Sequence, residues 1–186
     1  MKSLKNLDNR TGIGAILNER GLNGFAAEIG VAYGENADSI LSGWRGLGLM
    51  LIDPWDREKC GEYVDGSASI DFDGAFNHCL GLMAKHPMRT IAIRKTSSDA
   101  VVLFPDSFFD FVYIDGNHHN PQVTIDLLEW LPKVKSGGIF GGHDFYDLDT
   151  PHYRCDVKKA VEKMCAKHNF ELFVSPGCTS WWVIKP

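Results

Sequence analysis

Short apolar runs that end in small or acidic residues alternate along this chain with longer segments of helical periodicity. Runs of this length are typical of buried strands, and the segments between them carry apolar residues at helical spacing. The predicted strands are 25–31, 47–53, 90–95, 109–115, 139–143, 171–175 and 180–184, and the predicted helices are 35–44, 70–85, 97–103, 121–134 and 155–168. This alternation predicts an α/β fold with a mainly parallel sheet and helices on both faces.

The last two predicted strands differ from the others because only residues 176–179 separate them. A parallel pair needs a long crossover, so we expect this pair to be antiparallel and the last strand to run against the others. The 186 residues suit one domain spanning 1–186, in which residues 1–24 form a short extension before the first strand. Within that extension, residues 11–22 can form one short helix.

Charge and composition narrow the class of partner and the cellular location. The net charge is −5, and no basic run is present that would neutralise the phosphates of a nucleic acid or an anionic membrane. No apolar run approaches the roughly 18 residues of a membrane span. The five cysteines are odd in number and contain no C-x-x-C pair, which argues against a zinc knuckle or a disulfide scaffold. We therefore expect a cytoplasmic protein without a nucleic-acid or membrane partner.

In sheets of this kind the ligand crevice lies beyond the carboxyl ends of the strands, so the residues after each strand are the candidate site. After the first strand, Gly30 and Gly34 either let a ligand approach the backbone closely or only form a tight turn. The second strand ends in Asp53, which can hold a ribose diol or cap a loop. Trp55 can cover an apolar ligand edge. Neither the dinucleotide fingerprint nor the P-loop is present.

The third strand is followed by small polar residues, Thr96, Ser97, Ser98 and Asp99. Such a group can hydrogen-bond an adenine amino group, or it can cap the helix that follows. The sequence alone leaves both roles open.

The fourth and fifth predicted strands end in acids and histidines. Asp115 ends the fourth strand, and the pair His143 and Asp144 ends the fifth. Adjacent parallel strands bring these three residues together, which suggests a divalent-cation site; carboxylates favour Mg, Mn or Ca, and a histidine shifts the preference toward Mn, Fe or Zn. Alternatively His143 is a general base that Asp144 orients, or these residues cap loops. His118 and His119 also lie close by.

Three motifs, in order, resemble class I S-adenosylmethionine (SAM)-dependent methyltransferases. They are AAEIGVAYGENADSIL, LIDPW and FDFVYIDGNHHNPQVTIDLLEWLPKVKSGGIFGGHDFY. The chain looks most similar to the small bacterial O-methyltransferases related to macrocin-type sugar O-methyltransferases. The resemblance implies a Rossmann-like seven-stranded mixed sheet of order 3-2-1-4-5-7-6.

The resemblance also implies roles for individual residues. Gly30 and Gly34 would face the methionine part of SAM, supported by Glu28. Asp53 would hold the ribose, and the group 97–99 would lie near adenine. We include three further residues among the candidate cofactor contacts, namely Tyr33, Trp55 and Asp115.

For the reaction itself, the resemblance implies that Asp115, His143 and Asp144 occupy the positions of metal ligands. His143 departs from the family, where this pair is often Asp-Asp or Asp-Asn. His118 matches a family acid–base histidine, and His119 and His143 are further catalytic candidates. The short N-terminal extension implies a substrate site that is open or completed by a partner subunit in a homodimer.

The sequence thus predicts a SAM-dependent methyltransferase that acts on a small-molecule or sugar hydroxyl, with Mg or Mn as a possible second cofactor. Three alternatives remain at this point. A metal-dependent hydrolase would use Asp115, His143 and Asp144, a non-catalytic protein would only bind SAM, and an NAD-dependent oxidoreductase would lack its third glycine.

Overall fold

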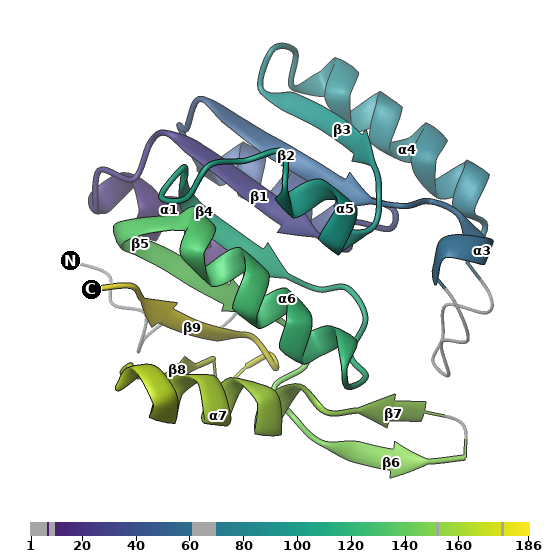
Figure 1. Cartoon of the computed structure of the whole chain (residues 1–186). Helices are drawn as coiled ribbons and strands as arrows, with labels where there is room; N and C mark the ends of the chain where they lie inside the picture. The colour runs from purple at the N-terminus through teal and green to yellow at the C-terminus, as the bar shows by residue number, and fades with distance from the viewer. Residues whose placement is uncertain (1–6, 8–9, 61–69, 152, 176) are drawn as a thin grey trace.

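A seven-stranded mixed sheet forms the centre of the molecule (Figure 1). The structure is a computed structural model that describes residues 7, 10–60, 70–151, 153–175 and 177–186. The strands of the sheet are β1 (Phe25–Ile29), β2 (Gly48–Asp53), β3 (Thr90–Arg94), β4 (Phe109–Ile114), β5 (Val134–Gly142), β8 (Phe173–Val174) and β9 (Trp181–Ile184). Their spatial order is β3-β2-β1-β4-β5-β9-β8. Counted within this sheet alone, that order is the predicted 3-2-1-4-5-7-6.

Strand direction also follows the prediction. The first five strands are parallel, whereas β9 is antiparallel to both β5 and β8. Every residue of β2 and β4 is buried. Parallel strands that are covered on both faces read as continuous apolar runs, which explains why these strands are easy to see in the sequence.

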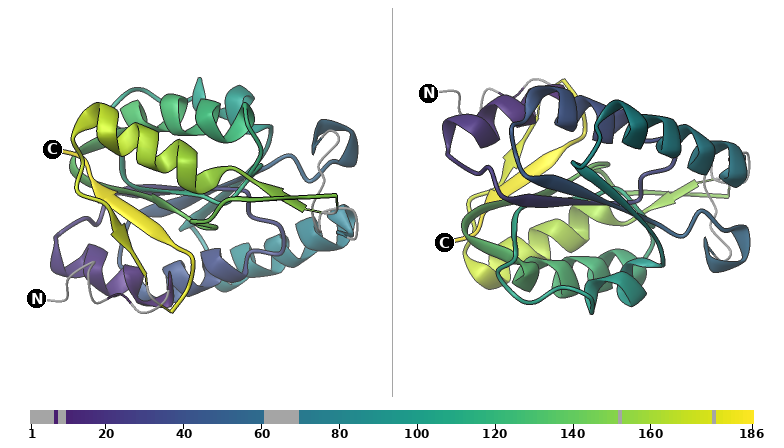
Figure 2. Two further views of the ribbon diagram at one scale, coloured as in Figure 1. Left: turned by 90° about the horizontal axis from the view of Figure 1, so that it is seen from below. Right: turned by 90° about the horizontal axis from the view of Figure 1, so that it is seen from above.

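Helices cover both faces of the sheet (Figure 2). One face carries α1 (Ile13–Glu19), α2 (Glu35–Gly43) and α4 (Phe72–Lys85), and the other carries α5 (Ser97–Val101), α6 (Gln122–Trp130) and α7 (Val157–His168). Side chains alternate between the faces along each strand, so Ala27 joins one core cluster and Ala26 the other. The fold class predicted from the sequence is confirmed.

Strand β5 is longer than the predicted strand 139–143. It contains Gly137 and Gly138, which lie before the predicted strand. Helix α6 ends at Trp130, a 3₁₀ turn follows at Leu131–Lys133, and β5 begins at Val134. Gly137 has a φ of 77°, and the pairing register of β4 with β5 shifts between Phe109 and Phe111. The glycines therefore form an irregularity inside the strand, where the backbone needs a conformation that other residues rarely adopt.

A two-stranded hairpin outside the main sheet was not predicted. Strands β6 (Leu148–Thr150) and β7 (Tyr153–Cys155) pair only with each other and extend from the body beside α7 (Figure 1). The helix predicted from residue 155 therefore starts at Val157. The loop predicted for 56–69 contains the short helix α3 (Arg57–Cys60), and its remainder lies outside the described residues.

The N-terminal helix expected within residues 11–22 is α1. No helix in the described ranges is long and apolar enough to cross a membrane. All five cysteines are free thiols.

Candidate active site

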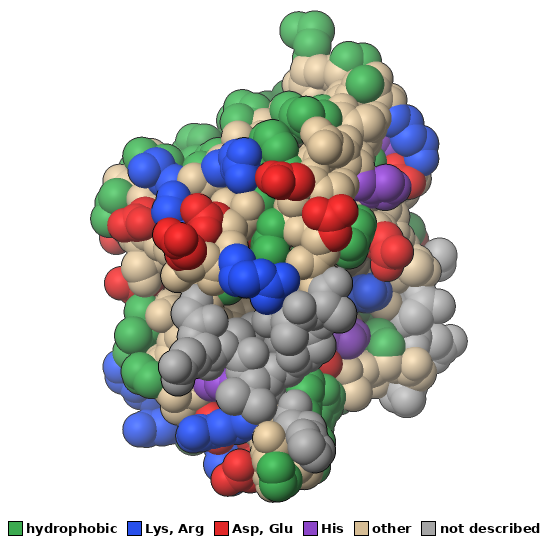
Figure 3. All heavy atoms as spheres, turned by 90° about the vertical axis from the view of Figure 1, so that its right-hand side faces the viewer, with side chains coloured by type: hydrophobic (Ala, Val, Ile, Leu, Met, Phe, Trp, Pro, Cys, Tyr) green, Lys and Arg blue, Asp and Glu red, His purple; other side chains and the backbone are tan. Residues whose placement is uncertain are grey.

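A cavity of about 610 Å³ lies at the carboxyl ends of β1, β2 and β4. Gly30 follows β1, Asp53 ends β2, and Asp115 follows β4, and all three line the cavity. The other lining residues are Ile29, Ala32, Ile52, Pro54, Lys59, Cys60, Ile70, Phe72, Thr96, Ser97, Ser98, Gly116, Asn117, His118, Gln122 and Asp126. The crevice expected from the strand ends is therefore present. Acidic, basic and apolar side chains are intermingled on this face, and the described residues form no broad basic surface there (Figure 3).

The two glycines of the first turn have different structural roles. Both have a φ of 82°. A side chain at Gly30 would collide with the backbone of Asp115, so this glycine lets β1 and β4 end close together. Gly34 precedes α2, and a side chain there would meet Leu82 and Cys79. Gly34 is not among the residues that line the cavity.

Asp53 organises the backbone of the same turn. Its Oδ2 accepts hydrogen bonds from the N–H groups of Val31 and Ala32 at 2.9 and 3.0 Å, and its Oδ1 accepts one from the N–H of Trp55 at 2.7 Å. The carboxylate thus caps a loop and also lines the cavity, so the loop-capping role is present. The ribose-binding role remains a prediction.

Glu28 lies beneath this turn as a fully buried carboxyl group. Asn36 donates a hydrogen bond from Nδ2 to Glu28 Oε1 at 2.9 Å. Glu28 Oε2 and Asn36 Oδ1 are buried without a hydrogen-bond partner among the described residues. Burial raises the pKa of Glu28 to about 8, although the hydrogen bond from Asn36 acts in the opposite direction. Glu28 is therefore largely protonated at neutral pH, and it supports the turn without lining the cavity.

The small polar group after β3 reaches the cavity through three of its four members. Thr96, Ser97 and Ser98 line the cavity, whereas Asp99 does not. The N–H of Asp99 donates to Thr96 Oγ1 at 3.2 Å, which caps α5. Here the capping role that the sequence left open is present alongside the cavity.

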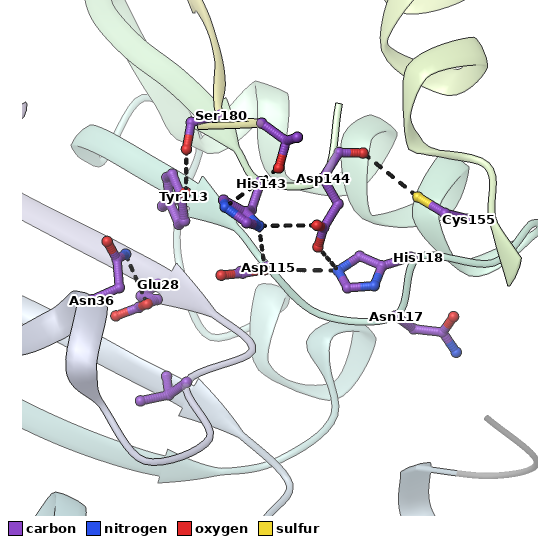
Figure 4. A network of polar contacts seen from close by, with 12 residues as sticks. Glu28, Asn36, Tyr113, Asp115, Asn117, His118, His143, Asp144, Cys155 and Ser180 are labelled. Atoms are coloured by element: carbon purple, nitrogen blue, oxygen red, sulfur yellow. Dashed lines mark hydrogen bonds and ion pairs between the residues drawn. The ribbon is translucent and has the colours of Figure 1, made fainter. Parts of the chain in front are cut away.

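The ends of β4 and β5 bring two carboxylates and two imidazoles together (Figure 4). His118 Nε2 lies 2.9 Å from Asp144 Oδ2 and 3.7 Å from Asp115 Oδ1. His143 Nδ1 lies 3.1 Å from Asp144 Oδ1 and 4.0 Å from Asp115 Oδ1. The other ring nitrogen of His143 is 3.5 Å from Thr179 Oγ1. The predicted convergence of these strand ends is therefore found.

The electrostatics of this cluster fix the charge of its members. Burial alone lowers the pKa of His118, but Asp115 and Asp144 outweigh it and raise the pKa to about 9. Burial raises the pKa of Asp144, yet His118 and His143 hold it well below its usual range. At neutral pH the cluster thus has a protonated His118 beside an ionised Asp144. His118 is consequently a charge-neutralising group here, and it is not free to act as a base.

The same residues have donor atoms suited to a metal ion. One ligand atom each from Asp115, His118 and Asp144 lies within 4.8 Å of the others. The ligand set predicted from the sequence contained His143 in place of His118. Two carboxylates with one imidazole fit Mn, Fe or Zn better than Mg, and a metal would take over the positive charge that His118 supplies when protonated.

A sequence model described as a methyltransferase domain matches residues 27–145. The chain belongs to this methyltransferase family. Its fold is that of the class I SAM-dependent O-methyltransferases, so the enzyme class predicted from the sequence is confirmed. A search of curated proteins found no match.

Solved structures share the fold of this methyltransferase at low sequence identity. A Corynebacterium glutamicum protein is 17% identical with a TM-score of 0.67, covering 95% of this chain and 78% of its own. An O-methyltransferase from Bacillus cereus in complex with SAH is 13% identical with a TM-score of 0.64. The match covers 97% of this chain and 84% of that protein. The O-methyltransferase TomG from Streptomyces achromogenes is involved in tomaymycin synthesis and was solved with SAM. It is 12% identical with a TM-score of 0.61, and the match covers 95% of this chain and 79% of TomG.

Three more predicted site residues of this methyltransferase, besides Glu28, Gly34, Asp99, His143 and Asp144, do not line the cavity. Trp55 is buried, donates from Nε1 to the carbonyl of Ala32 at 2.9 Å, and packs against Phe76. Tyr33 is exposed, and its ring contacts that of His78. His119 donates its backbone N–H to Asn117 Oδ1 at 2.8 Å, which shapes the loop after β4. The local backbone turns these side chains away from the cavity.

Two other residues were missed by the sequence reasoning. Arg10 donates from Nη1 to Asp115 Oδ2 at 3.2 Å, so the N-terminal segment reaches the acidic cluster. Asp126 lies on α6 and lines the cavity. Arg10 lies outside every motif, and no signal in the sequence marks it. Asp126 lies within the third motif, but the sequence analysis assigned it no role.

Proposed function

We propose that this methyltransferase transfers the methyl group of SAM to a hydroxyl group of a small-molecule or sugar acceptor. The observation that supports this most directly is the position of the acidic and histidine cluster beside the cavity. Asp115 and His118 belong to both, because they line the cavity and form part of the cluster. A cofactor in the cavity would therefore present its methyl group next to titratable side chains.

Methyl transfer from a sulfonium is an in-line displacement in which the protein aligns the acceptor and removes its proton. The acceptor oxygen must lie about 3 Å from the methyl carbon, with water excluded. The acceptor oxygen forms a bond to the methyl carbon as the bond to sulfur breaks, which gives the methyl ether, S-adenosylhomocysteine and a proton. The strand ends would supply the alignment, since Asp115 and Asp144 come from rigid elements.

His143 is the best-placed residue to take the proton. Its Nδ1 lies beside Asp144 Oδ1, so the carboxylate orients the ring and stabilises its protonated form. That arrangement leaves Nε2 for the acceptor hydroxyl, next to Thr179.

A divalent metal fits the same cluster and would lower the pKa of the acceptor hydroxyl when bound. Asp115, His118 and Asp144 would hold it. His143 would remain outside this set as a base, consistent with its departure from the family pattern. This assignment differs from the sequence prediction, in which His143 was a ligand.

The first test is calorimetric titration of SAM, and separately of NAD, into the purified protein with and without Mg or Mn. We expect SAM to bind in the micromolar range and NAD not to bind. Absence of SAM binding under every metal condition would overturn the proposal, and NAD binding in its place would favour an oxidoreductase.

The second test separates cofactor binding from catalysis. His143→Gln should lower methyl transfer by roughly 100-fold or more, because general-base catalysis contributes about that much. Asp115→Asn should also lower it, because this carboxylate belongs to the cluster and lines the cavity. SAM affinity should stay within about threefold for His143→Gln, since this residue does not line the cavity. Turnover equal to that of the parent in both variants would show that the cluster is not the reaction site.

A further inference from the structure

Arg10 places a half-buried guanidinium at the edge of the acidic cluster. It begins the 3₁₀ turn Arg10–Gly12 that leads into α1, and its side chain is 31% exposed. Nη1 donates to Asp115 Oδ2 at 3.2 Å, and the side chain also forms a hydrogen bond with Tyr113. The backbone N–H of Arg10 donates to the thiol of Cys178, in the loop between β8 and β9. Backbone and side chain contacts therefore fix the position of this cation.

The charges around Arg10 leave room for an anion. Burial lowers the pKa of Arg10, but Tyr113 and Asp115 raise it above its ordinary value, so the guanidinium is charged. Glu28, a further acid of the same network, is largely protonated at neutral pH. Two cations, Arg10 and protonated His118, thus accompany the two carboxyl groups of the cluster. An anion that approaches from this side meets no net negative charge.

The guanidinium has donors left for a ligand. Arginine carries five N–H donors in a planar fork, and the described contacts of Arg10 use those directed at Asp115 and Tyr113. The fork matches a carboxylate, which can accept two parallel hydrogen bonds from it. Because part of the side chain is exposed, an incoming molecule can reach it.

Arg10 lies close to the proposed base, and neither residue lines the cavity. Asp115 Oδ1 is 4.0 Å from His143 Nδ1, whereas Oδ2 accepts from Arg10. Figure 4 shows one oxygen of Asp115 pointing away from the two imidazoles. The base and the guanidinium are thus separated by a single carboxylate. A small molecule whose hydroxyl group reaches His143 can therefore extend a second group to Arg10.

We propose that Arg10 binds a carboxylate of the acceptor, so that the substrate is a hydroxy acid. The inference rests on the proposed function, because it assumes that the chain methylates a hydroxyl group. The carboxylate would pair with the guanidinium while the hydroxyl lies between the methyl donor and His143. The N-terminal segment would then select the acceptor, although Arg10 belongs to none of the three sequence motifs.

The test measures transfer of labelled methyl groups from SAM to matched pairs of compounds. Each pair joins a hydroxy acid with a neutral counterpart of similar shape: 3-hydroxybutyrate with 3-hydroxybutyramide, 4-hydroxybenzoate with 4-hydroxybenzamide, and galacturonate with galactose. The parent should methylate the acid of at least one pair with a kcat/KM about 10- to 100-fold above that of its counterpart, the range of one hydrogen bond to a charged group. The product should be a methyl ether, and a methyl ester in its place would overturn the inference.

Variants of Arg10 connect this preference to the guanidinium. In Arg10→Gln the preference for the acid should fall to within about threefold. The change should appear mainly as a higher KM, because the contact is made equally in the bound substrate and in the transition state. Arg10→Lys keeps the charge without the fork and should retain part of the preference. If Arg10→Gln does not fold, Arg10→Lys and the preference of the parent still decide the question.

Arg20→Gln is the matched control, because it removes an exposed arginine from the end of α1 in the same N-terminal segment. It should keep the preference of the parent. An equal loss in Arg20→Gln and Arg10→Gln, or an unchanged preference in Arg10→Gln, would overturn the role of Arg10.

Calorimetry with S-adenosylhomocysteine separates the two possible sources of a carboxylate. Its affinity for Arg10→Gln should stay within about threefold of that for the parent. A loss of tenfold or more would show that Arg10 holds the carboxylate of the cofactor, which overturns the inference. A parent that binds SAM but shows no preference for any acid overturns the inference and leaves the cofactor assignment standing. A parent that does not bind SAM overturns the proposed function as well.

Discussion

Glu28 should make the stability of this methyltransferase fall as the pH rises. In the folded chain its pKa is about 8, against 4.5 for the ordinary value. The unfolded chain therefore releases this proton above pH 4.5 while the folded chain keeps it until about pH 8. Between these values the unfolded state binds fewer protons, so the free energy of unfolding decreases with pH. Below pH 4.5 the stabilisation that Glu28 contributes is fully present. It is lost as the pH rises past about 8.

The size of the effect follows from the gap between the two pKa values. At about 1.4 kcal/mol per pH unit, the gap corresponds to at most about 5 kcal/mol, which is a large share of the 5–15 kcal/mol typical of a domain. Replacement by Gln removes the titration and keeps the shape. The Gln amide can accept from Asn36 Nδ2, as Glu28 Oε1 does, and donate to Asn36 Oδ1, which now lacks a partner among the described residues.

The assay is urea unfolding of the parent and of Glu28→Gln near pH 5 and near pH 8. The stability of the variant relative to the parent should rise by up to about 4 kcal/mol over this range, since other titrating groups cancel in the comparison. Glu35→Gln removes an exposed negative charge from the next turn and controls for the change in net charge. A relative stability that stays constant with pH would refute the reasoning, because Glu28 would then ionise alike in both states.

Two further predictions concern groups that hold the ends of secondary structure. Asp53→Asn leaves one oxygen in place of two and should lower the free energy of unfolding by about 2–4 kcal/mol, since the N–H groups of Val31 and Ala32 lose their acceptor; unchanged urea unfolding would exclude this loop-holding role. Lys185 donates from Nζ to three carbonyls in the segment 131–134, at 3.2, 3.2 and 2.6 Å. Lys185→Met should therefore lower thermal stability by about 1–2 kcal/mol, and a melting temperature equal to that of the parent would show that these bonds contribute nothing.

The parts of the fold that the sequence predicts well are those in which one physical rule dominates. Strands β2 and β4 are buried on both faces, so their apolar runs are continuous. The hairpin β6–β7 has no such signal, because all three residues of β6 are exposed and Thr150 and Asp149 are typical of turns. In β5, Gly137 reads as a strand breaker, although inside the sheet it forms an irregularity.

Site residues were predictable where the strand ends alone determine their position. Asp53 and Asp115 line the cavity because they end or follow buried parallel strands. Trp55 was placed in the cavity by the same rule, but its φ of 41° turns it into the core. A positive φ in a residue other than glycine is rare, so no sequence pattern announces it. To predict that Asp126 lines the cavity, one would need to know which face of α6 meets the cavity.

The hairpin β6–β7 also has an evolutionary consequence. It begins at Leu148, shortly after Asp144, and its strands pair with each other and with no strand of the main sheet. An insertion attached in this way can change in length or sequence while the sheet and the cavity at the strand ends keep their geometry. Changes in the hairpin can therefore accumulate separately from selection on the cavity at the strand ends.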